Sequence, residues 1–398
     1  MPSTPHVLIA GAGIGGLAAA VSLLTRGIDC DIYEQAPELK EVGAGLWLSV
    51  NGARVMTALG LEAEIRASTI EAEERVVRLW DSGRKWTLYK QGVSPAAHAP
   101  YVMLRAQLHR ILIDAAERLK PGIIHLNRRC TGFTQQGDSV TVDFADGSQA
   151  TGNILIGADG LHSKIREKAY GQIPGRFTNA LAWRGLVPMD RLRPHHRDRI
   201  VATWIGPNAH VSAYPARWQD ADLMTFSGQV ERSDWQLESW SETGTVAECV
   251  KDFAGWHEDI VEIIENTESL HKWGLFVREP LKQWTTGRVT LLGDACHSMV
   301  PYLGQGVNMA LEDALVLARC IQSHAGDAET ALKRYEAERL PRTTQVAARS
   351  ADMQYTFHNP ALAKPETAAA YVDSQWSPEK SRARYDWIYG YDATQVPV

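Results

Sequence analysis

Cysteine is scarce in this sequence, with five scattered residues among 398 and no C-x-x-C pair. This scarcity argues against a disulfide framework or a cysteine-held metal, so we expect no metal site and free thiols in a reducing cytoplasm. Long apolar runs are lacking too, because no stretch reaches the roughly 18 residues that a spanning helix requires. No basic segment followed by an apolar one opens the chain, which argues against a secretory signal. The net charge of −6 leaves no basic excess, so we expect neither nucleic acid nor a membrane as partner.

The length of the chain exceeds what a single hydrophobic core usually serves, which predicts two domains or one domain with a large insertion. A hydrophobic fraction of 44% is ordinary for a globular protein and argues against general disorder. The thirteen tryptophans are numerous and favour aromatic-lined cavities. We expect a monomer or a homodimer.

The N-terminal segment has the pattern of a strand, a helix and a second strand. Val7–Ala10 is a short apolar run, the alanine-rich residues 17–24 form a good helix, and residues 29–34 form another strand. Such a unit returns the chain in the same direction and therefore predicts a parallel sheet.

A G-x-G-x-x-G motif lies between the first strand and the helix. Its first glycine allows a tight turn, its second lets the backbone reach a pyrophosphate, and its third lets the helix approach the strand. The helix N-terminus presents free N–H groups to the phosphates, and an acidic residue at the end of the second strand can bind ribose hydroxyls. The alternative is a glycine-rich turn with a surface glutamate. The predicted dinucleotide contacts are Gly11, Gly13, Ile14, Gly15, Gly16, Glu34 and Gln35.

The middle of the chain differs, because tryptophans there stand among turn residues in patches typical of antiparallel strands. From Arg288 the strand–loop–helix pattern returns. We therefore predict an α/β protein with a discontinuous nucleotide-binding domain and an inserted β-sheet substrate domain. The predicted boundaries are 1–75, 100–178 and 275–360 for the first domain, 76–99 and 179–274 for the second, and 361–398 for a C-terminal extension.

Two later motifs also follow apolar strands: Gly157-Ala-Asp-Gly160 and the Gly293-Asp294 pair. Together with G-x-G-x-x-G, in this order and spacing, they resemble the single-component (class A) flavin-dependent aromatic hydroxylases over roughly residues 6 to 350. Within this family, the motif sequences are most similar to those of salicylate hydroxylase, 3-hydroxybenzoate 6-hydroxylase and 6-hydroxynicotinate 3-monooxygenase. The resemblance implies the Rossmann-like FAD-binding fold of the p-hydroxybenzoate hydroxylase type.

The same resemblance implies FAD as cofactor, O2 as co-substrate and hydroxylation of a small aromatic or N-heteroaromatic acid through a flavin C4a-hydroperoxide, with decarboxylation left open. Since only one complete G-x-G-x-x-G is present, we expect NADH or NADPH to bind transiently in a shared cleft. Two alternatives remain: a flavin oxidase or reductase that releases hydrogen peroxide, and a non-catalytic FAD-binding regulatory protein.

Four charged residues match cofactor contacts of that family. Asp294 would accept hydrogen bonds from the ribityl chain, and Arg105 resembles the arginine near the pyrophosphate. Asp159 resembles an acid whose loop lies near FAD and NAD(P)H, with a helix N-cap as the alternative. Arg54 resembles a further cofactor contact, with a surface cation as the alternative.

The segment from Pro301 to Asn308 carries the next match. Gly304 and Gly306 let backbone N–H groups approach a flavin at a helix N-terminus, whose partial positive charge would stabilise an anionic reduced flavin. Val307 and Asn308 belong to the same predicted cofactor contact. The family places the carbonyl of the residue matching Pro301 beside the reacting part of the flavin.

Substrate contacts are predicted on a strand around His210-Val-Ser-Ala-Tyr214, where alternate residues share one face. His210 could remove a phenolic proton, and Tyr214 could hydrogen-bond a phenolic or carboxylate oxygen. The alternative is a satisfied core histidine with an ordinary sheet tyrosine. Trp47 departs from the family and would reshape the pocket. Trp183 and Arg184 are further pocket candidates, although Arg184 could equally pair with a carboxylate.

Other polar residues are interpreted as structural. His297 lacks a second metal ligand at usable spacing, so we expect it to pack in a loop or helix. Glu312 and Asp313 fall early in a helix, where compensation of the helix dipole would explain them.

Overall fold

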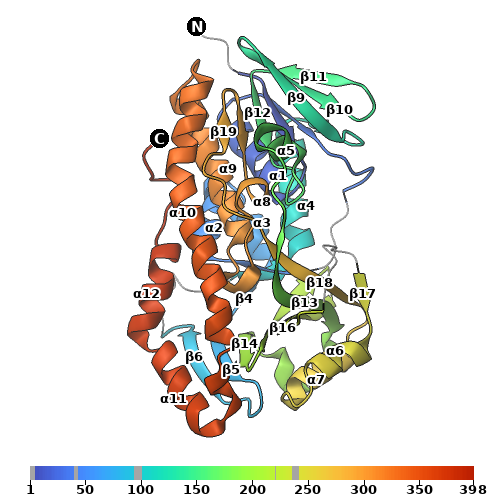
Figure 1. Cartoon of the computed structure of the whole chain (residues 1–398), viewed down its shortest axis with the longest axis vertical. Coiled ribbons are helices and arrows are strands. Elements are labelled where there is room, and N and C mark those ends of the chain that lie inside the picture. The colour runs from blue at the N-terminus through green and yellow to red at the C-terminus, as the bar shows by residue number, and fades with distance from the viewer. Residues whose placement is uncertain (1–4, 40–43, 94–100, 220, 235–241) are drawn as a thin grey trace.

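The computed structural model describes residues 5–39, 44–93, 101–219, 221–234 and 242–398. Residues 94–99 of the predicted substrate domain lie outside this part of the chain. Figure 1 shows an upper half built on one sheet and a lower half built on a larger sheet, with helix α10 (Ala328–Phe357) running along both. The long helix therefore connects the two halves.

The upper half is built on a mainly parallel sheet. β1 (Val7–Ala10) is central and pairs in parallel with β2 (Cys30–Tyr33) and β12 (Ile154–Gly157). α1 (Ile14–Leu24) follows β1, so the predicted strand–helix–strand unit is present. The sheet continues through β20 (Val289–Leu291) and β19 (Thr285–Thr286) at one edge and β8 (Ile124–His125) at the other.

An eight-stranded sheet forms the lower half. Its strand order is β17 (Glu242–Gly244), β18 (Leu270–Val277), β13 (Arg176–Pro188), β16 (Ala221–Glu231), β15 (Ala209–Trp218), β14 (Ile200–Gly206), β5 (Glu74–Leu79) and β6 (Lys85–Lys90). Helices α6 (Val246–Asp252) and α7 (Glu258–Glu265) pack on one face through an apolar cluster. β5 begins before the expected boundary at residue 76, and the division into domains stays a prediction.

Two small sheets complete the strands. One holds β3 (Gly45–Leu48), β7 (Tyr101–Leu104) and β4 (Ile70–Glu71), and the other holds β9 (Cys130–Gln136), β10 (Ser139–Phe144) and β11 (Gln149–Gly152). The remaining helices are α2 (Val50–Ala58), α3 (Glu62–Ser68), α4 (Arg105–Leu119), α5 (Lys164–Tyr170), α8 (Asp294–His297) and α9 (Gly306–Ser323). Short 3-10 turns are η2 (Met189–Arg191), η3 (Pro194–Arg197), η4 (Pro301–Leu303) and η5 (Pro360–Ala363).

The C-terminal extension lies against the lower half (Figure 1). Its helices α11 (Pro365–Gln375) and α12 (Pro378–Tyr389) share an apolar cluster with the large sheet. The Trp80 indole donates to the carbonyl of Leu362 at 3.0 Å, and the Trp86 indole donates to Asp373 at 2.6 Å. No helix among the described residues combines the length and the apolar character needed to cross a membrane.

Helices α9 and α10 are joined by a fully buried ionic network. Glu312 pairs with Arg339 at 2.7 Å and with Arg342 at 2.8 Å. Asp313 pairs with Arg339 at 2.8 Å and with the Nε2 atom of His297 at 2.5 Å. The interpretation of Glu312 and Asp313 as dipole compensation is therefore wrong, because both carboxylates are unexposed and bind cations from a second helix.

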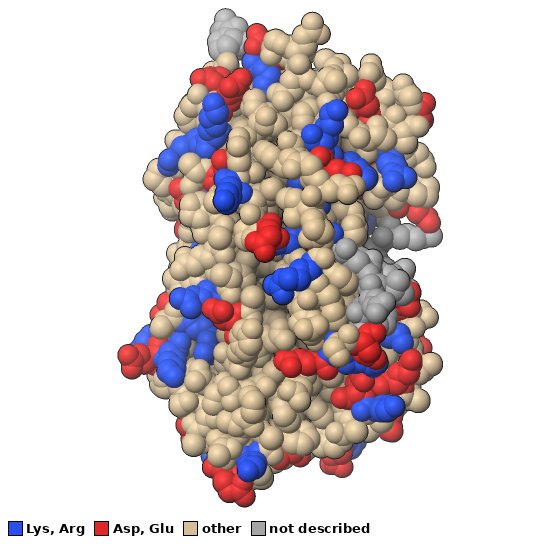
Figure 2. Space-filling view, in the orientation of Figure 1, with Lys and Arg blue, Asp and Glu red and all other residues tan. Residues whose placement is uncertain are grey.

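Acidic and basic side chains are intermingled on the molecular face in Figure 2. On this face the described residues form no broad region of one charge sign. This face therefore offers no single-sign field that would steer a charged macromolecule toward it.

Candidate active site

A cavity of about 340 Å³ lies between the two halves. Its upper wall comes from the loops at the carboxyl ends of β1, β12 and β20, and its lower wall comes from the large sheet. In open α/β sheets, ligands bind outside the carboxyl ends of the parallel strands. The cavity is therefore the candidate site, and both halves contribute to it.

Glycines shape the upper wall. Gly11 has φ of +105°, and a Cβ there would lie 2.5 Å from the carbonyl oxygen of Ala158. A Cβ on Gly13 or Gly306 would meet no atom within 4 Å, although both residues line the cavity. These two glycines leave room for a ligand at the N-termini of α1 and α9, where free N–H groups favour negative charge.

Ile14 and Gly15 also line the cavity, whereas Gly16 sits where α1 crosses the Gly11 turn. A Cβ on Gly16 would lie 2.0 Å from the carbonyl oxygen of Gly11, which explains the third glycine of the motif. Glu34 directly follows β2 and accepts a hydrogen bond from the N–H of Ala12 at 2.8 Å. This places its carboxylate at the same turn.

Gln35 follows Glu34, is exposed and lies outside the cavity lining. Asp294 and Arg105 both line the cavity. Asp294 is exposed, and its carboxylate accepts no hydrogen bond from the described residues, so it is free to bind a hydroxyl group. Arg105 begins α4, with its N–H donating to Ala44 at 2.8 Å.

Asp159 turns away from the cavity toward α5. Its Oδ2 atom accepts hydrogen bonds from the N–H groups of Lys164 at 2.7 Å and Ile165 at 3.2 Å. Burial raises the pKa of this carboxyl, and the hydrogen bonds act in the opposite direction. The side chain therefore caps a helix, which is the alternative weighed for Asp159, while its neighbours Ala158 and Gly160 line the cavity.

The structure does not bring Arg54 to the cavity. Its guanidinium donates to the carbonyls of Tyr389 at 2.5 Å and Tyr391 at 3.0 Å. This geometry corrects the expectation that Arg54 contacts the cofactor. The side chain instead joins α2 to the C-terminal extension.

The segment after β20 divides into lining residues and a support. Pro301, Gly304, Gly306 and Val307 line the cavity. Asn308 is fully buried and turns the other way, accepting from the N–H of Ser49 at 3.0 Å and donating to the carbonyls of Trp47 and Gly304. The expectation of a direct cofactor contact for Asn308 is therefore corrected to a bond between β3 and the start of α9.

On the lower wall, His210, Ser212 and Tyr214 all line the cavity from β15, as the alternation predicts. The Tyr214 hydroxyl packs against Gly45, where a Cβ would lie 2.6 Å from the phenolic oxygen. Burial raises the pKa of Tyr214 to about 12, so the phenol stays protonated and can donate. Burial, followed by the neighbouring His358, holds the pKa of His210 well below its usual range.

Trp183 and Arg184 take opposite sides of β13. Trp183 is fully buried on the α6–α7 side and donates from its indole to Asp252 at 2.8 Å, which corrects its assignment to the pocket. Adjacent residues of a strand point to opposite faces, so only Arg184 lines the cavity. Its guanidinium stacks 4.7 Å from the centre of the Trp273 ring.

Arg184 forms no salt bridge with any carboxylate of the described residues. Burial lowers the pKa of its guanidinium to about 10. A partly buried cation without a neighbouring anion carries a desolvation cost, and an anionic ligand would relieve that cost. The cavity therefore combines an unpaired cation with a phenolic donor and a neutral imidazole.

The comparisons with known proteins agree with this arrangement. A family model described as an FAD binding domain matches residues 4–350. The chain is 38% identical to 3-amino-4-hydroxybenzoate 2-monooxygenase PtnB3 of Streptomyces platensis, covering 98% of this chain and 97% of the relative. It is 31% identical to a 6-hydroxynicotinate 3-monooxygenase of Bordetella bronchiseptica, covering 100% of this chain and 98% of the relative.

The chain belongs to the FAD-dependent aromatic monooxygenases. The resemblance inferred from its motifs is confirmed. Among solved structures, HpxO of Klebsiella pneumoniae in complex with FAD and uric acid superposes with a TM-score of 0.81 at 28% identity, covering 99% of this chain and 97% of the other.

FAD is the cofactor of this monooxygenase, and the upper wall fits it. The open positions at Gly13 and Gly306, two helix N-termini and the free Asp294 carboxylate suit a phosphate-bearing, polyhydroxylated ligand. The flavin end would then meet the lower wall, where Tyr214, His210 and Arg184 lie.

Several cavity residues of the monooxygenase escaped the sequence analysis. Arg75 of β5 lines the cavity, stacked 4.2 Å from the Trp47 ring centre and 4.7 Å from that of Tyr385. It also donates to the Tyr389 hydroxyl at 3.3 Å, so the C-terminal extension supports the wall beside Trp47. Phe357, the last residue of α10, also lines the cavity. No local pattern marks these residues, because their neighbours come from distant segments.

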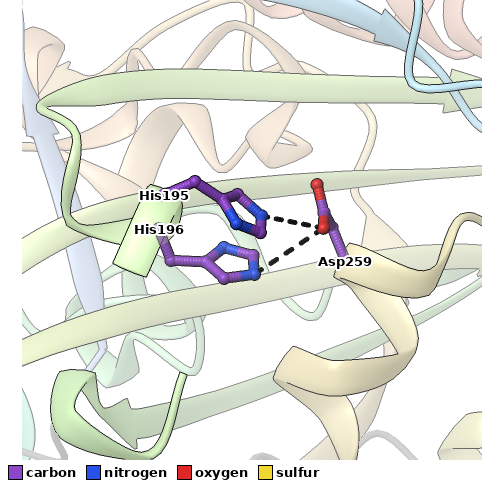
Figure 3. A group of neighbouring side chains, drawn as sticks. All are labelled: His195, His196 and Asp259. Carbon is purple, nitrogen blue, oxygen red and sulfur yellow. Dashed lines mark hydrogen bonds and ion pairs between the residues drawn. The ribbon is translucent and has the colours of Figure 1, made fainter. Parts of the chain in front are cut away.

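A histidine-rich cluster on the far side of the large sheet has a structural explanation. His195 and His196 of η3 both point toward Asp259 of α7 (Figure 3). Arg193 already binds Asp259 at 2.7 Å and Glu262 at 2.6 Å. Since Arg193, His195 and His196 all bind carboxylates of α7, the cluster holds η3 to α7.

Proposed function

We propose that this monooxygenase hydroxylates a small aromatic acid bearing a phenolic hydroxyl group, using NADH or NADPH and O2. The observation that carries the proposal is Arg184, a partly buried cavity cation with no carboxylate partner among the described residues. A guanidinium binds a carboxylate through two parallel hydrogen bonds, which orients as well as attracts an aromatic acid.

The other lower-wall groups then receive roles from their chemistry. Tyr214 donates a hydrogen bond to a substrate oxygen, since its phenol stays protonated. His210 accepts the proton of the substrate phenol, and the resulting phenolate makes the ring richer in electrons. When bound, FAD supplies the activation of O2 with electrons from NAD(P)H, and the walls exclude water.

On the cofactor side, the proposed contacts follow the geometry. Asp294 accepts from ribityl hydroxyls, and Arg105 lies where an anionic cofactor group would pass. The N–H groups at Gly306 and Val307, at the start of α9, would hold the flavin and would favour its reduced, anionic form. The nicotinamide cofactor would enter the same cleft transiently, and the protein would act in the cytoplasm as a monomer or a homodimer.

Within this class, we propose 3-amino-4-hydroxybenzoate as the first substrate to test. The support is the relative from Streptomyces platensis, which is named for that acid and aligns over nearly the whole of both chains. Its carboxylate and its phenolic oxygen stand at opposite ends of one ring. Arg184 and His210, on neighbouring parts of the lower wall, could each bind one end.

The test follows NADH and NADPH oxidation by the purified holoenzyme with 3-amino-4-hydroxybenzoate, 6-hydroxynicotinate, salicylate and 3-hydroxybenzoate. The expected result is substrate-stimulated oxidation with a product that gains one oxygen atom. Gain of oxygen with loss of CO2 would assign a decarboxylative hydroxylation. Stoichiometric hydrogen peroxide without an oxygenated product, or no stimulation by any acid, would refute the proposal.

A further inference from the structure

A chain of hydrogen bonds leads from the cavity to the surface through two histidines. The Nδ1 atom of His210 lies 2.7 Å from the Nε2 atom of His358, and the Nδ1 atom of His358 lies 2.8 Å from the Oε1 atom of Glu231. His358 is buried, whereas the Glu231 side chain is 37% exposed. This series of hydrogen bonds therefore begins at the lower wall of the cavity and ends at a carboxylate that is exposed to water.

The direction of these hydrogen bonds follows from the carboxylate. A carboxylate only accepts, so the Nδ1 atom of His358 carries the proton that it shares with Glu231. In a neutral His358, the Nε2 atom is then an acceptor, and His210 must donate to it from Nδ1. This leaves the Nε2 atom of His210 with a free lone pair, and that atom has no hydrogen-bond partner among the described residues.

We propose that His358 and Glu231 form a proton exit from the active site, acting through His210. This inference rests on the proposed function, because the proton comes from the phenolic substrate. His210 touches the substrate, while His358 is a positioning residue that selects the tautomer of His210 and passes its proton on.

Every proton and charge is accounted for in this transfer. The phenol O–H bond breaks and its proton binds Nε2 of His210, while the Nδ1 proton of His210 moves to Nε2 of His358. The Nδ1 proton of His358 moves to Glu231, which releases it to water. Both imidazoles stay neutral with exchanged tautomers, and the reverse path reprotonates the product oxygen and restores the starting tautomers.

The surroundings favour a neutral His210 and an ionised Glu231. His210 packs against the rings of Phe357 at 4.8 Å and Tyr302 at 5.0 Å. Burial and the adjacent His358 lower the pKa of His210, and the hydrogen bond from His358 lowers the pKa of Glu231. Burial raises the pKa of Tyr302, the other titratable group against His210, so it stays neutral.

The architecture of α10 supports this arrangement. His358 is the residue that ends the helix, with its N–H donating to the carbonyl of Gln354 at 2.8 Å. The Gln354 side chain donates to the same oxygen of Glu231 at 3.1 Å. The C-terminal end of α10 therefore supplies His358, the middle member of the hydrogen-bond series, and also binds Glu231, its last member.

The test measures proton release rather than turnover. Oxidised holoenzyme without NAD(P)H is mixed with 3-amino-4-hydroxybenzoate in weakly buffered solution containing a pH indicator, and the rate of acidification is followed by stopped flow. General acid–base transfer commonly contributes a factor of about 100 or more, so we expect His358→Gln to slow release at least about tenfold. The dissociation constant of the acid should change little, because His358 does not line the cavity.

The matched control is His196→Gln, which removes another buried histidine that bonds a carboxylate, Glu262 at 3.1 Å, outside the cavity. Release should keep its wild-type rate in this variant. Glu231→Gln, at a half-exposed position, provides a second arm should His358→Gln fold poorly, and it should slow release less because water can replace the carboxylate. Added imidazole should restore release in His358→Ala.

Unchanged release rates in both His358→Gln and Glu231→Gln would overturn the proton exit while leaving the proposed function intact. Binding of the acid by the wild type without any proton release would also overturn it. If the wild type binds none of the phenolic acids, the proposed function fails first and the exit fails with it.

Discussion

Replacing Arg184 by glutamine isolates the interaction on which substrate binding is proposed to rest. The guanidinium lies in the cavity, 4.7 Å from the centre of the Trp273 ring and without a carboxylate partner among the described residues. A hydrogen bond to a charged group contributes about 1.5–3 kcal/mol. We therefore expect the dissociation constant of 3-amino-4-hydroxybenzoate to rise by about 10- to 150-fold.

Although Arg184→Gln should weaken substrate binding, it should not lower the free energy of unfolding. In the substrate-free protein, Arg184 is a partly buried cation without a carboxylate partner among the described residues, so its removal takes away a desolvation cost rather than an ion pair. The free energy of unfolding of Arg184→Gln should equal or exceed that of the wild type. Urea unfolding of the holoenzyme checks this.

Two controls make the test specific. Arg217→Gln removes an exposed arginine of β15 that pairs with Asp222 at 2.8 Å, and it should leave binding unchanged. The ligand control is 2-aminophenol, which lacks only the carboxylate. Arg184→Gln should lose its discrimination between the acid and 2-aminophenol, whereas the wild type should keep it.

The pH dependence has a defined sign. Because burial lowers the pKa of Arg184 to about 10, deprotonation above that pH removes the charge that binds a carboxylate. Binding of benzoate, which has no group titrating there, should weaken as pH rises above about 10, the pKa of the free protein. The weakening should end at the higher pKa that Arg184 has when a carboxylate is bound. An unchanged dissociation constant in Arg184→Gln, together with a large loss of stability, would refute the carboxylate anchor.

Three other substitutions test the remaining parts of the structure. Gly13→Ala should fold normally, since its Cβ meets nothing within 4 Å, yet lose bound FAD as measured by flavin absorbance, because that space faces the cofactor; retained FAD would contradict the fit. Glu312→Ala leaves two buried arginines without this partner and should cost about 3–5 kcal/mol in denaturant unfolding; a cost below 1 kcal/mol would argue against the network. Arg54→Ala should keep FAD affinity but speed proteolysis of the C-terminal extension, whose carbonyls it binds; a fall in FAD affinity would restore its cofactor role.

Short motifs predicted the cofactor half well because each is local. A strand, a glycine turn and a helix N-terminus follow one another within a few residues, as at Gly11–Gly16. The same holds where Gly293-Asp294 follows β20. The geometry of each motif depends on residues that are neighbours in the sequence. The fold and the family could therefore be predicted before any tertiary contact was known.

Alternation on strands predicted part of the lower wall of the cavity. It placed His210, Ser212 and Tyr214 on one face of β15, and all three line the cavity. The same principle, applied to Trp183 and Arg184, would have separated them, because neighbouring residues on a strand face opposite ways. The tryptophan belongs to the α6–α7 core and the arginine to the cavity.

Single polar residues were predicted least well, because their partners lie far away in the chain. Arg54 and Asn308 resemble cofactor contacts, yet one binds carbonyls of the C-terminal extension and the other binds β3. Glu312 and Asp313 would suit a helix N-terminus, but arginines from α10 neutralise them in the interior. A side chain's partner depends on packing between elements, which no local pattern encodes.

The sequence by itself determined that this protein binds FAD on a Rossmann-like sheet and that it resembles aromatic hydroxylases, since those properties reside in contiguous turns. Only the tertiary structure decided that Arg184 has no carboxylate partner within the described part of the chain and that His210 meets His358 beside Glu231. These groups come from β13, β15, β16 and the end of α10. Their meeting depends on how the large sheet packs against the long helix.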